Sequence, residues 1–99
     1  MTREEILDFL QKHKEVLAKR YQVQKIGLFG SFAREEAHEE SDIDFVIHTP
    51  IKRFRNRYEL KYFLEKHLHR PVDIGYIDAL HPFIRKDIED EIIYVQTAE

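Results

Sequence analysis

The sequence contains no cysteine and no long hydrophobic run. Without cysteine, the chain can form neither disulfides nor thiolate metal sites. No apolar stretch approaches the roughly 18 residues that a membrane-spanning helix needs. The residues from Thr2 to Glu5 are polar or charged, so the N-terminus has no signal-peptide hydrophobic region. These absences favour a soluble protein of the cytoplasm.

Strong positive charge is also absent. The formal net charge is −3 at pH 7, which argues against direct, non-specific binding to nucleic acid. The charge is uneven, because six acids and no base lie between Glu35 and Asp44, whereas seven bases and two acids lie between Lys52 and Arg70. The basic stretch has two interpretations: solvated helix faces, or a docking surface for an acidic partner or nucleic acid.

The chain is nevertheless able to form a core, because 42% of its 99 residues are hydrophobic and 12% are aromatic. This length suits one small domain, which we expect to span residues 1–99. Thr2 and Glu5 have the spacing of a capping box, and the helical spacing after them predicts a first helix to about Arg20.

Alternating patterns and turn residues predict the remaining elements. Strands are expected at 23–29, at 42–48, at 72–76 and, as a short strand or extended tail, at 92–95. Helices are expected at 31–37, at 54–69 and at 82–89, the last with Phe83, Ile84 and Ile88 facing inward. The order indicates an α/β (α+β) fold with a small mixed sheet and helices packed against it.

The most informative segment runs from Gly27 to Ile47 and includes Gly-Ser-Phe-Ala-Arg followed by Ser-Asp-Ile-Asp. Residues two apart in a strand point to the same face, so Asp42 and Asp44 would hold their carboxylates side by side. Aspartate is disfavoured in strands, and adjacent carboxylates repel unless a cation lies between them. Asp73 joins the pair if its strand is a neighbour. The alternative is a turn cap at Asp42 and a surface residue at Asp44.

Three carboxylates in this arrangement would suit hard divalent cations, which bind carboxylates together with substrate phosphates. Such a cluster can hold two cations about 3.5–4 Å apart and clamp a triphosphate between them. Gly30 and Ser31, at a strand-to-helix turn, would offer backbone N–H groups to the phosphates. Ser31 is equally compatible with a plain helix N-cap. Arg34 can pair with a phosphate or with a local acid such as Glu36.

The stretch from Gly30 to Asp44 resembles the signature of the nucleotidyltransferase superfamily whose fold is shared with DNA polymerase beta. The two short sequences and the chain length are similar to its minimal branch, the MNT domain. The resemblance extends to Val72-Asp73-Ile74 and to residues 84–95. The chain departs from the pattern at Glu35, where many relatives have glycine, which should alter the end of the short helix and not the metal ligands.

The resemblance implies a magnesium-dependent enzyme that transfers AMP from ATP to a tyrosine of a HEPN-family partner toxin, with this chain as the antitoxin. The catalytic and metal-binding residues would be Asp42, Asp44 and Asp73, and the nucleotide-binding residues would be Gly30, Ser31 and Arg34. Two alternatives remain. One is a non-catalytic module that neutralises its partner by contact, and the other is a nucleotidyltransferase for small molecules.

Overall fold

A computed structural model describes residues 1–97, and residues 98 and 99, the end of the predicted domain, lie outside the described part. The helices are α1 (Arg3–Lys12), α2 (Lys14–Lys19), α3 (Phe54–Leu68) and α4 (Pro82–Ile88), with a short 3-10 helix at Ile77–Ala79. The strands are β1 (Lys25–Phe29), β2 (Ile43–His48), β3 (Val72–Tyr76) and β4 (Ile93–Gln96). Within residues 1–97, no helix has the length and apolar character needed to cross a bilayer.

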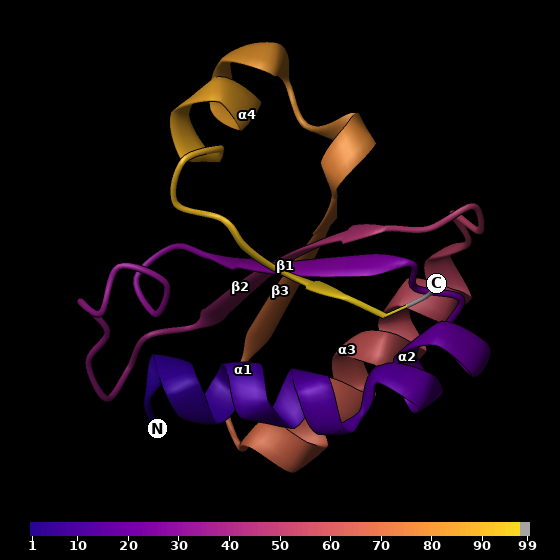
Figure 1. Ribbon diagram of the computed structural model, residues 1–99, viewed down its shortest axis with the longest axis horizontal. Helices are drawn as coiled ribbons and strands as arrows, with labels where there is room; N and C mark the ends of the chain where they lie inside the picture. The colour runs from indigo at the N-terminus through magenta and orange to yellow at the C-terminus, as the bar shows by residue number, and fades with distance from the viewer. Residues whose placement is uncertain (98–99) are drawn as a thin grey trace.

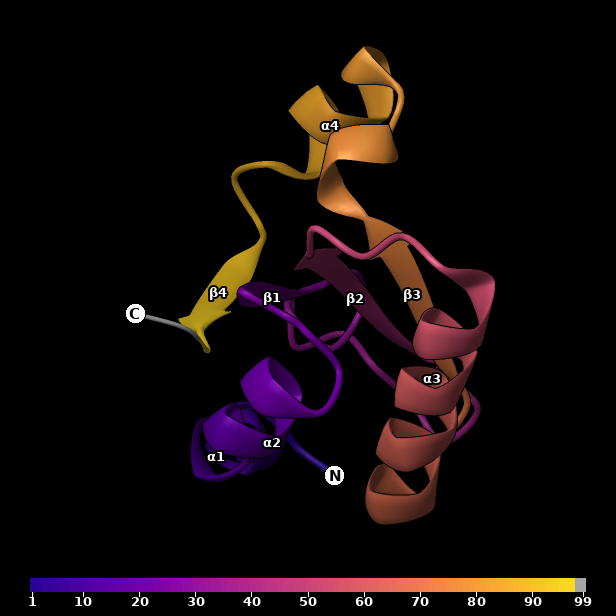
Figure 2. The same ribbon diagram turned by 90° about the vertical axis from the view of Figure 1, so that its right-hand side faces the viewer.

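The four strands form one mixed sheet in the order β3-β2-β1-β4. Strand β1 runs antiparallel to both β2 and β4, whereas β2 and β3 are parallel. Parallel strands need a crossover connection, and α3 provides it between β2 and β3. Figures 1 and 2 show α1, α2 and α3 on one face of the sheet and α4 on the other. The predicted fold class is confirmed.

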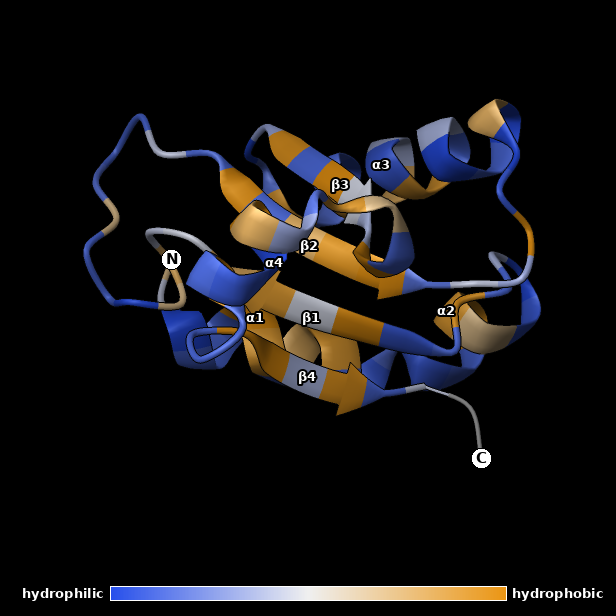
Figure 3. Ribbon diagram, turned by 90° about the horizontal axis from the view of Figure 1, so that it is seen from above, coloured by the Kyte–Doolittle hydropathy of each residue, from blue (hydrophilic) through white to orange (hydrophobic). Residues whose placement is uncertain are grey.

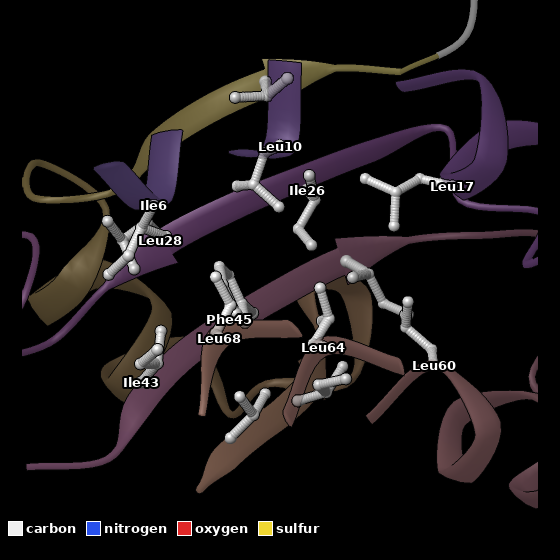
Figure 4. Close-up of a cluster of buried hydrophobic side chains, with 14 of the residues drawn as sticks. Ile6, Leu10, Leu17, Ile26, Leu28, Ile43, Phe45, Leu60, Leu64 and Leu68 are labelled. Carbon is white, nitrogen blue, oxygen red and sulfur yellow. The ribbon is translucent and has the colours of Figure 1, made fainter. Parts of the chain in front are cut away.

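The core lies between the sheet and the three helices on its covered face. Figure 4 shows the principal side chains, which are Ile6 and Leu10 of α1, Leu17 of α2, Ile26 and Leu28 of β1, Ile43 and Phe45 of β2, and Leu60, Leu64 and Leu68 of α3. Burying one such side chain contributes about 1.5–3 kcal/mol. Strand alternation sends the intervening residues to the opposite face. Figure 3 shows hydrophilic positions interrupting the hydrophobic strands β2 and β3.

The predicted first helix is interrupted at His13. Its start is as expected, because the Thr2 hydroxyl accepts the Glu5 amide at 3.2 Å and the Glu5 carboxylate accepts the Thr2 amide at 3.0 Å. At the break, His13 Nδ1 lies 2.8 Å from the carbonyl oxygen of Phe9, and the two rings stack. His13 has φ −112° and ψ +19°, outside the helical region, which separates α1 from α2. Leu17 beyond the break is fully buried.

The predicted helix at 31–37 is also wrong, since residues 31–35 form successive turns and residues 36 and 37 have no regular structure. The Arg34 amide donates to the Gly30 carbonyl at 3.1 Å, and the Glu36 amide donates to the Ser31 carbonyl at 2.8 Å. Glu35 has φ +60°, a left-handed conformation that ends any helical continuation and favours glycine. The glycine that the family resemblance leads us to expect at this position would fit that conformation.

Helix α4 differs from the prediction in its packing. Pro82 occupies the first turn as expected, and His81 precedes it as the cap. Phe83 and Ile84, however, are 76% and 54% exposed and do not face inward. Helix α4 contains no buried residue, because the turns around it carry it away from the sheet surface (Figure 1).

Candidate functional site

The predicted site residues come together on the sheet face opposite the core. Asp44 in β2 is paired in register with Phe29 of β1 and with Asp73 of β3. Gly30 directly follows Phe29, so the glycine turn and two of the aspartates occupy one row across three neighbouring strands. Asp42 lies at the entrance to β2, exposed to solvent like Asp73, whereas Asp44 is half-buried. The expectation that the strands of Asp44 and Asp73 are neighbours is confirmed.

Asp44 is the electrostatic centre of this row. Partial burial raises the pKa of its carboxyl group above the ordinary value, and the negative charges of Asp73 and Asp42 raise it further. The charge of Arg34 acts in the opposite direction. The charged form of Asp44 is disfavoured by burial and by the neighbouring carboxylates. A bound cation would therefore stabilise the charged form of this side chain.

The carboxylates do not constitute a complete metal cage. Among the residues that the structure describes, no group of three or more histidine, aspartate or glutamate side chains is arranged to hold a metal ion by itself. The donor set is nonetheless all oxygen, and the pKa of Asp44 is raised by burial and, in addition, by the charges of Asp73 and Asp42. This chemistry fits Mg²⁺, which binds through one or two carboxylates and completes its shell with water and substrate phosphates.

Gly30 is required for two separate reasons. Its φ of +77° lies in the region that side-chain-bearing residues rarely adopt. A Cβ atom at this position would also lie 2.2 Å from Oδ2 of Asp44, closer than any real contact. The turn after β1 therefore passes directly against the central carboxylate. Ser31 follows, half-buried, in the position that the sequence indicated.

A residue that the sequence did not indicate, Glu91, completes the site. The Gly30 amide donates to Oε2 of Glu91 at 2.6 Å. The Arg34 guanidinium lies 3.1 Å from the same oxygen and 3.3 Å from Oε2 of Glu36. Arg34 thus pairs with acids in this structure, one of the two roles that the sequence left open. Only the fold brings Glu91, 61 residues further along the chain, to Gly30.

A cleft of about 420 Å³ lies between β3 and the exposed side of α3 and includes Asp73 in its lining. Its lining is Phe54, Arg57, Tyr58 and Lys61 from α3, with Phe29, Phe45, Asp73, Ile74 and Gly75 from the sheet. The basic stretch from Lys52 to Arg70 therefore contributes one wall of a cleft that contains a site aspartate.

Comparison with known proteins agrees with this geometry. A family model described as the nucleotidyltransferase domain matches residues 10–95. A Methanocaldococcus jannaschii protein provisionally named protein adenylyltransferase is 42% identical over 98 residues, covering 95% of this chain and 98% of the relative. Protein adenylyltransferase MntA of Thermococcus cleftensis is 38% identical over 96 residues, covering 96% of this chain and 97% of the relative.

Solved structures of similar fold include a minimal nucleotidyltransferase. A structure described provisionally as a minimal nucleotidyltransferase superposes with a TM-score of 0.72 at 32% identity, covering 94% of this chain and 95% of that one. A toxin–antitoxin crystal structure with AMP-PNP has a TM-score of 0.59 at 24% identity, covering 85% of this chain and 64% of that one. The second likeness speaks for the fold alone.

Proposed function

The chain belongs to the nucleotidyltransferase domain family, as a minimal (MNT) member with the polymerase beta-like fold, and from this premise we propose that it transfers AMP from ATP to a protein. It is a nucleotidyltransferase by family. The relatives named protein adenylyltransferase support protein as the acceptor class. The single observation that carries the proposal is the row formed by the Gly30 turn, Asp44 and Asp73 across three adjacent strands.

In the proposed reaction, the acceptor hydroxyl oxygen forms a bond to the α-phosphorus of ATP. The bond between that phosphorus and the oxygen bridging to the β-phosphate breaks, and pyrophosphate leaves. We assign proton acceptance from the hydroxyl to Asp73, because it lies on the exposed edge strand beside Asp44. The Gly30 amide and Arg34 are the donors for the phosphate oxygens, with Ser31 beside them.

Asp42, Asp44 and Asp73 are the residues that would hold Mg²⁺, as a two-metal site with the phosphates of ATP as co-ligands. When bound, the metal offsets the negative charge of the phosphates and of the departing pyrophosphate. This assignment is supported by the surroundings of Asp44, whose pKa is raised by burial and further by the charges of Asp73 and Asp42.

The proposed partner is a HEPN-family toxin that is modified on a tyrosine, with this chain as its antitoxin in the cytoplasm, where ATP is available. The family resemblance motivates the partner. Solved structures of similar fold are toxin–antitoxin complexes, including one with AMP-PNP. Tyrosine is a weak nucleophile at neutral pH because its ordinary pKa is about 10, so it would need the basic carboxylate and nearby cations of this site.

A second candidate function is neutralisation by contact without transfer. One observation favours it: the amide of Gly30, the proposed phosphate donor, already bonds to the carboxylate of Glu91. Transfer of AMP to a small molecule is the further alternative, and it requires no protein acceptor.

The deciding experiment is to incubate the chain with a candidate HEPN partner, in the presence of ATP and Mg²⁺, and to record the intact mass of that partner. We expect an added adenylyl group that requires Asp44, so the Asp44→Asn variant should leave the mass unchanged. Asp87→Asn, an exposed aspartate on α4, is the matched control and should transfer normally. A partner silenced without mass change by wild type and Asp44→Asn alike would identify the contact module.

A further inference from the structure

The connection between β1 and β2 carries predicted site residues at both of its ends. Gly30, Ser31 and Arg34 lie at its start, and Asp42 lies at its end, directly before β2. Figure 1 shows this connection extending beyond the end of the sheet. Within residues 1–97, no hydrogen bond or ion pair holds the side chain of Asp42. The position of Asp42 therefore depends on how the backbone around it is held.

Arg70, in the link at 69–71 between α3 and β3, holds the residues before Asp42. Its Nη1 atom donates to the carbonyl oxygen of Glu39 at 2.8 Å and lies 3.3 Å from that of Ser41 and 3.4 Å from that of His38. A guanidinium is a permanent donor with no acceptor of its own, so it suits a group of backbone carbonyls. This one side chain thus gathers the carbonyl oxygens of the segment that leads to Asp42.

The residue after Asp42 is held by the same link. The Ile43 amide donates to the carbonyl oxygen of Pro71 at 3.0 Å. Asp73, the partner of Asp44 in the sheet, follows Pro71 by two residues. The backbone on both sides of Asp42 is therefore tied to the segment that leads into β3 and its aspartate.

Arg70 also contacts the other end of the connection. Its guanidinium carbon lies 5.2 Å from the ring centroid of Phe32, a buried residue that directly follows Gly30 and Ser31. A cation over an aromatic face is attracted to it, and the flat guanidinium stacks there in a way that an ammonium group does not. Arg70 therefore lies between the turn proposed to bind phosphate and the residues that precede Asp42.

The charge of Arg70 complements this connection. Six acids and no base lie between Glu35 and Asp44, so that stretch contains no cation of its own. Arg70 brings a positive charge to the stretch from about 30 residues further along the chain. A nearby positive charge offsets the repulsion among acids that would otherwise spread the connection apart.

We propose that Arg70 is a positioning residue for nucleotidyl transfer, because it fixes Asp42 beside Asp44 and Asp73, the other carboxylates assigned to Mg²⁺. In this role Arg70 touches neither the nucleotide nor the metal. It acts through the backbone before Asp42, and its contact with Phe32 keeps that backbone in a constant relation to the Gly30 turn. The inference rests on the proposed function and adds the residue that assembles its site from two separate ends of one connection.

Hydrogen exchange of the metal-free chain tests the contact itself. The Ser41 amide donates to the His38 carbonyl at 3.0 Å, within the segment that Arg70 holds. In Arg70→Ala, we expect this amide to exchange with solvent about tenfold faster, the factor that about 1.4 kcal/mol of lost local protection produces. Amides of β1 should exchange as in the wild type.

Two further variants separate the contact from a general loss of charge or of folding. Arg70→Lys keeps the charge and should give an intermediate rate, since an ammonium group can donate to one carbonyl but has no flat face for Phe32. Lys66→Ala removes an exposed base from the neighbouring part of α3 and should leave the exchange at Ser41 unchanged. Exchange at Ser41 that is the same in Arg70→Ala as in the wild type would overturn the proposal.

Calorimetry with Mg-ATP tests the effect on the site. We expect Arg70→Ala to bind about tenfold more weakly than the wild type, or by about 1.4 kcal/mol. In the Asp42→Asn background the same substitution should have little effect, because Arg70 acts through the carboxylate that is already lost. A merely structural role, or a long-range effect of charge, would lower the affinity by the same factor in both backgrounds.

Unchanged Mg-ATP affinity in Arg70→Ala, or equal losses in the two backgrounds, would overturn the assignment of Arg70 as a positioning residue. Failure of the proposed function has a different signature, namely no Mg-ATP binding by the wild-type chain. The exchange measurement needs neither metal nor nucleotide, so it decides in that case too whether Arg70 holds the segment before Asp42.

Discussion

The backbone amide of Gly30 donates to the side-chain carboxylate of Glu91 over 2.6 Å. The same carboxylate oxygen lies 3.1 Å from the guanidinium of Arg34. A negatively charged oxygen with an amide and a guanidinium as donors has the surroundings of a bound phosphate oxygen. In the proposed function, Glu91 therefore occupies the place that a phosphate of ATP would take and must give up these donors when the nucleotide binds.

Glu91→Gln should bind Mg-ATP more tightly than the wild type does. The glutamine side chain has the same length and keeps an acceptor oxygen. It lacks the negative charge that strengthens the hydrogen bond from Gly30 and the ion pair with Arg34. It also removes a negative charge from the vicinity of the phosphates. We expect an affinity about tenfold higher by titration calorimetry, or about 1.4 kcal/mol.

Glu89→Gln is the matched control, since it removes an exposed charge two residues earlier. It should leave the affinity unchanged. An affinity for Mg-ATP that falls in Glu91→Gln would mean that the carboxylate positions the nucleotide and does not compete with it.

Gly30→Ala should lower both stability and nucleotide affinity. Its φ of +77° imposes a cost of roughly 1–2 kcal/mol on any side chain, and its Cβ would push the Asp44 carboxylate out of place. Gly75→Ala is an internal comparison, because its Cβ would have an ordinary contact of 3.8 Å with Leu80. That variant should be neutral or more stable by up to about 1 kcal/mol. Equal urea midpoints for the two variants would refute the argument.

Asp44→Asn should stabilise the metal-free protein at neutral pH. Because the pKa of Asp44 is raised above 3.8 by burial and by Asp73 and Asp42, the folded state binds its proton more tightly than the unfolded chain does. The associated stability is fully present below the ordinary pKa and is lost as pH rises through the folded value. The advantage of Asp44→Asn should therefore shrink as pH falls. Urea unfolding in EDTA between about pH 4 and pH 7 measures it, and a constant difference would contradict the shift.

Arg34→Ala should weaken Mg-ATP binding, and the loss should be larger when Glu91 is already Gln, because Arg34 then gives up no ion pair to reach the phosphates. The two side chains share one contact at 3.1 Å, so their substitutions are not expected to add. A double-mutant cycle of the two variants by calorimetry gives the coupling. Lys86→Ala, an exposed base on α4, serves as the control. Strict additivity would show that Arg34 does not transfer from Glu91 to the phosphates.

Local patterns in the sequence were sufficient to predict most of the elements. Alternation identified β2, and the predicted strand at 72–76 has the bounds of β3, while the capping box at Thr2 located the start of α1. The pairing of Asp44 with Asp73 followed from spacing together with the tendency of successive strands to be neighbours. These features depend on residues close together in the chain.

The errors have a tertiary origin. At the break, the His13 ring packs against Phe63 and His67 of α3. The turns after Gly30 include a left-handed residue at Glu35. Phe83 and Ile84 have helical apolar spacing, yet the path of the chain leaves them in solvent. Glu91 carried no sequence signal, since an acid after a short helix is unremarkable until the fold places it against Gly30. The assignment of Asp42, Asp44 and Asp73 to metal remains a prediction.

None of the seven residues of α4 is buried, so this helix should unfold locally more readily than the rest of the domain. Segments with few buried contacts unfold locally at a free energy well below that of the whole molecule. Amide hydrogens of α4 should therefore exchange with solvent much faster than those of α3, whose Leu60, Leu64 and Leu68 lie in the core. Glu91 follows α4 by three residues, so a local opening there would release the Gly30 amide while the sheet stays folded. Access to the phosphate position would then be governed by the fraying of one short helix, on a timescale independent of global unfolding.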